Sequence, residues 1–161
     1  MTERERSGPT DEPGDEVFQH HMPGNTCFGC GQENERGLRL ESRWRGDVAV
    51  ATFHPRPEHA AGRADVLNGG IIATIIDCHS IGTAIADAYR REGRPMGTGE
   101  TIRYVTARLT VSYHAPTPTD SPVELEARLV AVDGRKTTVA VDLMSRGQRC
   151  ASGEVLAVRV P

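Results

Sequence analysis

The chain has 161 residues, a formal net charge of −3 and 37% hydrophobic residues. This length and composition indicate one domain whose core needs neither disulfides nor a metal. The small net charge argues against a broad nucleic-acid surface, and no apolar run is expected to be long enough to span a bilayer, so neither nucleic acid nor a membrane is a predicted partner.

Residues 1–16 are expected to form a disordered acidic tail. They contain six acidic residues against Arg4 and Arg6, a local charge of −4 that leaves +1 for residues 17–161. Apart from Met1 the segment has no aliphatic residue, so it cannot bury enough surface to offset its ordering entropy. Residues 17–161 then form the single domain. Nothing near Met1 is typical of a signal peptide, so a cytoplasmic protein is expected.

Cys27 and Cys30 have the spacing of metal ligands. The sequence has no second CxxC or HxxxH pair to complete a tetrahedral site, however. Cys78 and Cys150 lie in apolar stretches, where cysteine is usually a small hydrophobic residue. A tight glycine-rich turn is therefore favoured over a zinc site at Cys27 and Cys30, and neither a metal nor a cofactor is predicted.

Two strands are expected before the longest apolar segment. Residues 37–44 alternate apolar and polar side chains, a turn follows at Gly46-Asp47, and residues 48–53 form a second, apolar strand. Residues 54–67 are rich in proline, histidine and charge, which is typical of a loop.

The segment from Gly69 to Arg91 predicts a helix. It contains six isoleucines among small alanines and threonines, and it is too long for a strand. Asn68 is a good N-cap, and Gly93 follows as a stop signal. Because the helix is apolar on nearly every side, it is expected to be buried all round.

Four further strands are predicted, at 105–115, 123–132, 136–144 and 149–160. In the first of them five apolar side chains alternate onto one face, which we expect to face the core: Val105, Ala107, Leu109, Val111 and Tyr113. Thr106 is then expected on the opposite, polar face. Asp133-Gly134 predicts a hairpin. The order of elements predicts an α+β fold, a curved antiparallel sheet of about six strands wrapped around one long central helix.

Asp77 lies within the apolar helix. One interpretation is a core aspartate whose hydrogen bonds are satisfied; the other is a desolvated carboxylate with a raised pKa, suited to act as a base or nucleophile. Gly69 and Gly70 open the same helix, where free N–H groups and the helix dipole favour a developing oxyanion.

Three segments resemble the PaaI-like hotdog thioesterases. They are the entry segment Cys27-Phe-Gly-Cys30-Gly31, the helix start Leu67-Asn-Gly-Gly-Ile-Ile-Ala-Thr-Ile-Ile-Asp77, and the strand Tyr104-Val-Thr-Ala-Arg-Leu-Thr-Val-Ser-Tyr-His-Ala-Pro116. The resemblance covers roughly residues 27–160 in element order. It implies a hotdog fold that hydrolyses an acyl-CoA thioester.

The resemblance also implies roles for single residues. Gly69 matches the glycine whose N–H faces the thioester oxygen, and Asp77 matches the catalytic acid, as general base or as nucleophile. Thr106 matches a hydroxyl residue that helps to position water. Asn68 stands where the family usually has histidine, and Gly70 is expected beside the substrate.

Gly69 and Asp77 are eight residues apart, so the rise of the helix separates them by about 12 Å. One carbonyl cannot touch both. Two antiparallel helices related by a two-fold axis would bring Gly69 of one copy near Asp77 of the other, which predicts a homodimer with two equivalent sites. The resemblance implies the same dimer, often paired again into a tetramer.

Other polar residues are further candidates for the site. His59 is expected either at the acyl entrance or in solvent, and Arg135 and Lys136 are either an ordinary hairpin tip or a clamp for the CoA phosphates. His79 lies about 200° around the helix from Asp77 and is expected to be a core histidine.

Three alternatives to hydrolysis remain open. A hotdog domain can bind or sense acyl-CoA without turnover, because a fold does not fix a function. Hotdog folds also host hydratases, and a small metal-binding module could be built on Cys27 and Cys30.

Overall fold

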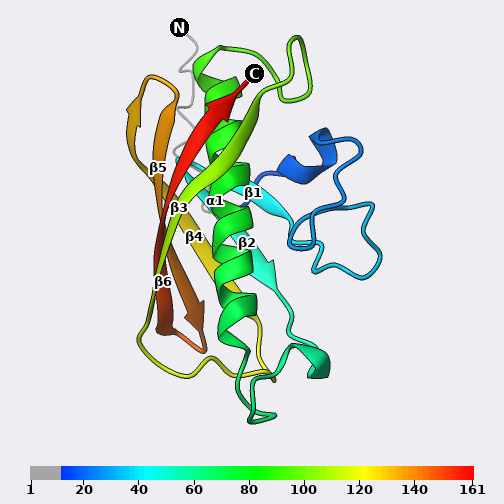
Figure 1. Ribbon diagram of the computed structural model, residues 1–161, viewed down its shortest axis with the longest axis vertical. Coiled ribbons are helices and arrows are strands. Elements are labelled where there is room, and N and C mark those ends of the chain that lie inside the picture. Colours follow the sequence, from blue (N-terminus) through cyan, green and yellow to red (C-terminus); the bar gives the residue numbers. More distant parts are fainter. Residues whose placement is uncertain (1–11) are drawn as a thin grey trace, which may run out of the picture.

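The structure is a computed structural model that describes residues 12–161, so residues 1–11 of the predicted tail lie outside the described part. One helix packs against an antiparallel sheet of six strands in the order β1-β2-β4-β5-β6-β3 (Figure 1). The predicted α+β architecture is confirmed. The elements are β1 (Ser42–Arg45), β2 (Val48–Phe53), α1 (Gly69–Arg91), β3 (Arg103–Tyr113), β4 (Val123–Asp133), β5 (Lys136–Ser145) and β6 (Gln148–Val160), with short 3-10 helices η1 (Phe18–His21) and η2 (Pro57–His59).

The predicted start and end of α1 are confirmed. The Asn68 side chain accepts hydrogen bonds from the N–H groups of Gly70 and Ile71, as an N-cap residue does. After the last turn, Gly93 takes a positive φ of 68°, which glycine adopts without strain.

Two parts of the chain enclose α1. The sheet covers one side, and the N-terminal segment 17–40 lies across the other (Figure 1). Phe18 and Leu40 of that segment are buried, and Gly82 of the helix lies against Phe18. A stripe of the helix is nevertheless only partly covered or exposed: Gly70, Thr74, Asp77 and Ile81. The expectation of a helix buried all round is therefore wrong along this stripe.

The first strand is shorter than expected from the alternation of residues 37–44. β1 begins only at Ser42, and Arg39 has a positive φ of 52°. The N–H groups of Leu38 and Leu40 donate to the carbonyls of Phe28 and Gly29 instead of to a neighbouring strand. The alternation thus marks an irregular segment whose leucines face the core.

A β-bulge divides β3 into two halves with opposite side-chain parity. Thr106 pairs with Ala157 and Arg108 with Leu156, so Ala107 is an extra residue on this strand. Before the bulge Tyr104 is buried and Val105 is half exposed, and after it Val111 packs on the core. The prediction of one continuous core face was therefore wrong: Val105, Ala107, Leu109 and Tyr113 are exposed, and of the five predicted residues Val111 packs on the core.

The strands after β3 match their predicted positions within a residue or two, with the β4–β5 hairpin at Asp133-Gly134. At the other end of the chain, the described part of the predicted tail runs beside β1. There the Gly14 N–H donates to the Trp44 carbonyl at 2.7 Å. The boundary between tail and domain stays a prediction.

Within residues 12–161, α1 is a helix long and apolar enough to cross a membrane, with a mean hydropathy of 1.4 over an 18-residue window. The expectation that no apolar run has this length was therefore wrong. Its hydropathy is high because Asp77 is the only charged side chain between Gly69 and Ala86. In the fold, 61% of that window is buried, as befits a core helix.

Candidate active site

Asp77 is held by Thr106 at the free edge of the sheet. The Thr106 hydroxyl donates to Asp77 Oδ1 at 2.6 Å, a short distance typical of a hydrogen bond to a carboxylate. The sequence placed Thr106 on the opposite face of β3. The bulge at Ala107 is the reason for the difference, because it shifts the parity of the strand between Thr106 and Arg108.

Partial burial makes the carboxyl group of Asp77 more basic than usual. Desolvation raises the pKa of its carboxyl group, the Thr106 hydrogen bond opposes that rise, and the nearby Cys27 adds to it. The carboxylate is half-buried, with one oxygen fixed by Thr106. A desolvated and oriented carboxylate of this kind is suited to take a proton from water.

The N-terminus of α1 presents one free backbone donor. Asn68 Oδ1 accepts from Gly70 at 2.8 Å and from Ile71 at 3.2 Å. Among the residues that the structure describes, no acceptor is found for the Gly69 N–H. The cap therefore engages the N–H groups of Gly70 and Ile71 and leaves the Gly69 N–H available at the positive end of the helix dipole.

Tyr113 lies against Gly69, a contact that sequence analysis missed. Its hydroxyl donates to the Gly69 carbonyl at 2.7 Å, and a Cβ added at Gly69 would meet the tyrosine ring at 3.4–3.5 Å. The position of Tyr113 on β3 was predicted only as part of a core face. Its exposed fraction is 54%, so the ring forms a wall beside Gly69 and not part of the core.

A groove opens beside this end of the helix. Its volume is about 720 Å³, and Gly69 and Tyr113 lie on its wall. Much of the lining is apolar, with side chains that include Val66, Leu67, Ile72 and Pro116. A groove of this size and lining is suited to an acyl chain.

The contacts between α1 and β3 run in opposite directions along the two elements. Thr106 contacts Asp77, while Tyr113, seven residues later, contacts Gly69, eight residues earlier. β3 therefore runs antiparallel along α1 and touches both candidate catalytic positions. Since the two positions remain about 12 Å apart along the helix, one copy does not bring them together.

The remaining predicted site residues lie away from this pair. His59 is buried in η2, where its Nδ1 accepts from the Arg56 N–H at 3.0 Å and its ring packs 5.3 Å from Phe53. Among the described residues, the groove lining does not include its side chain. Arg135 and Lys136 are exposed at the β4–β5 hairpin. Their roles toward a substrate stay predictions.

His79 is a core histidine, as expected. It is fully buried, with Nδ1 2.8 Å from Ser42 Oγ and Nε2 3.0 Å from the Ala49 carbonyl. Desolvation lowers its pKa to about 4, so the ring is neutral near neutral pH. It links α1 to β1 and β2 and does not face Asp77.

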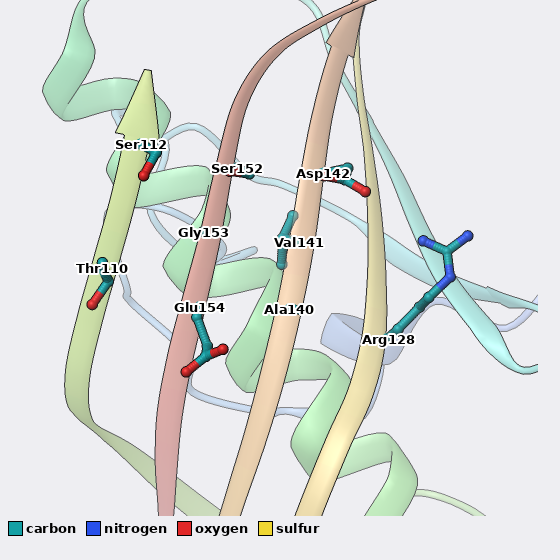
Figure 2. A pocket seen from close by; sticks show the side chains of 9 residues that line it. All are labelled: Thr110, Ser112, Arg128, Ala140, Val141, Asp142, Ser152, Gly153 and Glu154. Carbon is teal, nitrogen blue, oxygen red and sulfur yellow. The ribbon is translucent and has the colours of Figure 1, made fainter. Parts of the chain in front are cut away.

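A second hollow, of about 320 Å³, lies on the outer face of the sheet (Figure 2). Thr110, Ser112, Asp142 and Glu154 point outward there, and α1 lies behind the strands. The sheet separates this hollow from Asp77, so it is not part of the candidate active site.

Known proteins resemble this chain in sequence and in structure. The model of the thioesterase superfamily matches residues 64–152. A thioesterase superfamily protein from Shewanella loihica is 39% identical, with a TM-score of 0.62 over 76% of this chain and 91% of that one. The PaaI protein of E. coli is 11% identical (TM-score 0.62; 77% and 81% covered). The Streptococcus mutans protein smu.793, solved bound to acetyl CoA, is 16% identical (TM-score 0.57; 71% and 82% covered). No curated protein matches the chain.

Proposed function

The chain belongs to the thioesterase superfamily, and from that premise we propose that it hydrolyses an acyl-CoA thioester to a free acid and CoA. The hotdog fold and the PaaI-like resemblance are confirmed. The observation that carries the proposal is the half-buried Asp77, which Thr106 fixes at 2.6 Å. On the same helix lies the Gly69 N–H, for which the described part of the chain offers no acceptor. The fold accommodates a CoA thioester, since smu.793 was solved with acetyl CoA.

The proposed reaction uses Asp77 as the base. Its carboxylate takes a proton from water, and the hydroxide formed attacks the thioester carbonyl carbon. The carbonyl oxygen gains the negative charge and accepts a hydrogen bond from the Gly69 N–H. Collapse of this intermediate breaks the C–S bond, and the CoA thiolate leaves and takes a proton. Attack by Asp77 itself, through a mixed anhydride, is the alternative covalent route.

The reaction needs two copies of the chain. β3 lies at the end of the sheet, and within the described residues it pairs only with β6. If two β3 strands pair antiparallel around a two-fold axis near Leu109, Thr106 of one copy lies opposite Tyr113 of the other. Asp77 of one copy then approaches Gly69 of its partner, because Thr106 and Tyr113 mark those two positions. We therefore propose two shared sites for each dimer.

The exposed side chains along β3 support this dimer. Val105 is 50% exposed, Leu109 37% and Tyr113 54%, and the partly covered stripe of α1 includes Asp77, which Thr106 of β3 contacts. Burying this surface would remove apolar area from water and pair the open backbone groups of the strand. The groove beside Gly69 would then receive the acyl group.

The β4–β5 hairpin is proposed as the clamp for the CoA phosphates. The Arg159 N–H donates to the Arg135 carbonyl, and Arg159 Nη1 lies 2.8 Å from Glu92. These contacts place Arg135 and Lys136 at the C-terminal end of α1. A two-fold axis through the centre of β3 places the C-terminal end of α1 in one copy near Gly69 of the other copy. Arg135 and Lys136 would then face the entrance of the shared site.

Hydrolysis is tested by thiol release from a panel of acyl-CoA substrates, with purified wild type beside Asp77→Asn. We expect kcat to fall by about 10²–10⁴-fold in the variant, because the proton acceptor is lost. Asp87→Asn is the matched control: Asp87 is on the same helix but pairs with Arg91 at 2.6 Å, so its loss should leave kcat unchanged. Retention of most activity in Asp77→Asn would remove Asp77 from the mechanism.

The second candidate is an acyl-CoA binder without turnover. Asn68 favours it, since this residue stands where the family usually has histidine and its side-chain oxygen is committed to the helix cap. Thermal stabilisation by acyl-CoA in the absence of thiol release across the whole panel would favour the binder over the hydrolase.

A further inference from the structure

Three cysteine thiols from two distant segments meet beside α1. Cys27 and Cys30 lie in the turn of the N-terminal segment, and Cys78 lies on α1, 48 residues further along the chain. The Sγ atoms of Cys27 and Cys78 are 3.7 Å apart, and the three sulfurs lie within 4.8 Å of one another. The helix thus supplies the ligand that the sequence spacing alone did not reveal.

The separation of the sulfurs is that of metal ligands. Zinc binds thiolates at about 2.3 Å in tetrahedral geometry, which puts two sulfurs about 3.8 Å apart. A disulfide would require about 2.05 Å. The Cys27–Cys78 distance therefore needs almost no adjustment to accept an ion, and Cys30 needs only a small movement.

The turn is shaped to sit directly on the helix. A Cβ at Gly29 would collide with Cys78 Sγ and with the Thr74 side chain, so only glycine permits this approach. The Gly31 N–H donates to the Cys27 carbonyl at 2.8 Å and closes the turn. Backbone geometry, rather than flexible side chains, holds Cys27 and Cys30 beside Cys78.

We propose that Cys27, Cys30 and Cys78 form a three-thiolate site for Zn²⁺. Thiolate sulfurs are preferred ligands of this ion. Cys78 is buried, Cys30 is half-buried and Cys27 is exposed, so the site opens to solvent at Cys27, where water completes the tetrahedron. Bound zinc would join the N-terminal segment to α1.

The test is a zinc titration of the full-length, fully reduced protein against a chromophoric chelator, with no substrate present. We expect one zinc ion per chain in the wild type and an affinity at least 100-fold lower in Cys27→Ser. The exposed Cys27 is chosen because its replacement leaves the core intact, which circular dichroism verifies. Cys150→Ser is the matched control: its thiol is buried in β6, near the Pro116 carbonyl, and its loss should not change the affinity.

Cobalt substitution gives an independent measurement. Co²⁺ in the wild type should show thiolate-to-metal charge-transfer absorption that Cys27→Ser loses and Cys150→Ser keeps. Equal affinity in wild type and Cys27→Ser would overturn the site. So would a reduced protein that binds no zinc but forms a Cys27–Cys78 disulfide in air. Hydrolysis is measured separately by thiol release, so failure of the zinc site is distinguishable from failure of the proposed function.

Discussion

Asn68 affects both the stability of α1 and the proposed chemistry at Gly69. Its side-chain oxygen caps α1 through Gly70 and Ile71, and the backbone N–H of the next residue, Gly69, is the proposed oxyanion donor. Its own N–H donates to the His59 carbonyl at 2.9 Å, which fixes the loop before the helix. The structure thus assigns Asn68 a capping contact, while its part in catalysis stays a prediction.

Two substitutions of Asn68 separate these roles. Asn68→Ala should lower the free energy of unfolding by about 1 kcal/mol, because the cap is lost, and should leave kcat within a few-fold of wild type. Asn68→Asp retains a capping oxygen and should keep the stability, but a negative charge beside the developing oxyanion should lower kcat about tenfold or more. Urea unfolding and thiol-release kinetics measure both effects. An equal loss of kcat in the two variants would instead indicate that the Asn68 amide acts on the substrate directly.

Expectations for single residues were confirmed where local chemistry determines the contact that the residue makes. The N-cap at Asn68 follows from the affinity of its side chain for free N–H groups, and the core position of His79 follows from helical phase. The Thr106–Asp77 contact and the approach of Cys78 to Cys27 depend on residues 29 and 51 positions apart, so local patterns did not reveal them.

The bulge in β3 is the element-level feature on which the site depends. Without a bulge, strict alternation could not place Thr106 and Tyr113 on the same helix-facing side, because they are seven residues apart. The sequence predicted the strand and its length but not the bulge, since Val105 and Ala107 continue the apolar alternation without a break. The pairing of β3 with β6 determines the residue at which the side-chain parity of β3 changes.

Deletion of Ala107 should therefore leave the site intact. Thr106 and Tyr113 are then six residues apart, an even number, so regular alternation keeps both side chains on the helix-facing side. The pairs Thr106–Ala157 and Arg108–Leu156 already lie on either side of the extra residue and need not change. Thiol release should give a kcat within a few-fold of wild type, and circular dichroism verifies that the variant is folded. A folded deletion variant that loses as much activity as Asp77→Asn would contradict this account of the bulge.

At the scale of the whole molecule, the proposed shared site makes a quantitative prediction. Asp77→Ala and Gly69→Val should each be inactive as homodimers. When the two are co-refolded in equal amounts, half of the dimers are mixed, and each mixed dimer has one site with an intact Asp77 and an intact Gly69. Thiol release should therefore recover to about a quarter of wild type. Activity that stays at the level of the separate variants would contradict sites shared between copies.

The open edge of β3 also has a consequence during synthesis. A newly made copy exposes an eleven-residue strand whose outer N–H and C=O groups have no partner among the described residues. Its exposed side chains include Val105 and Leu109. Such an edge pairs with any compatible strand that it meets, so productive assembly competes with aggregation from the moment the chain leaves the ribosome. Slow expression at low temperature would favour the specific partner, and the strand that lines the proposed active site is then also the segment that determines the yield of folded protein.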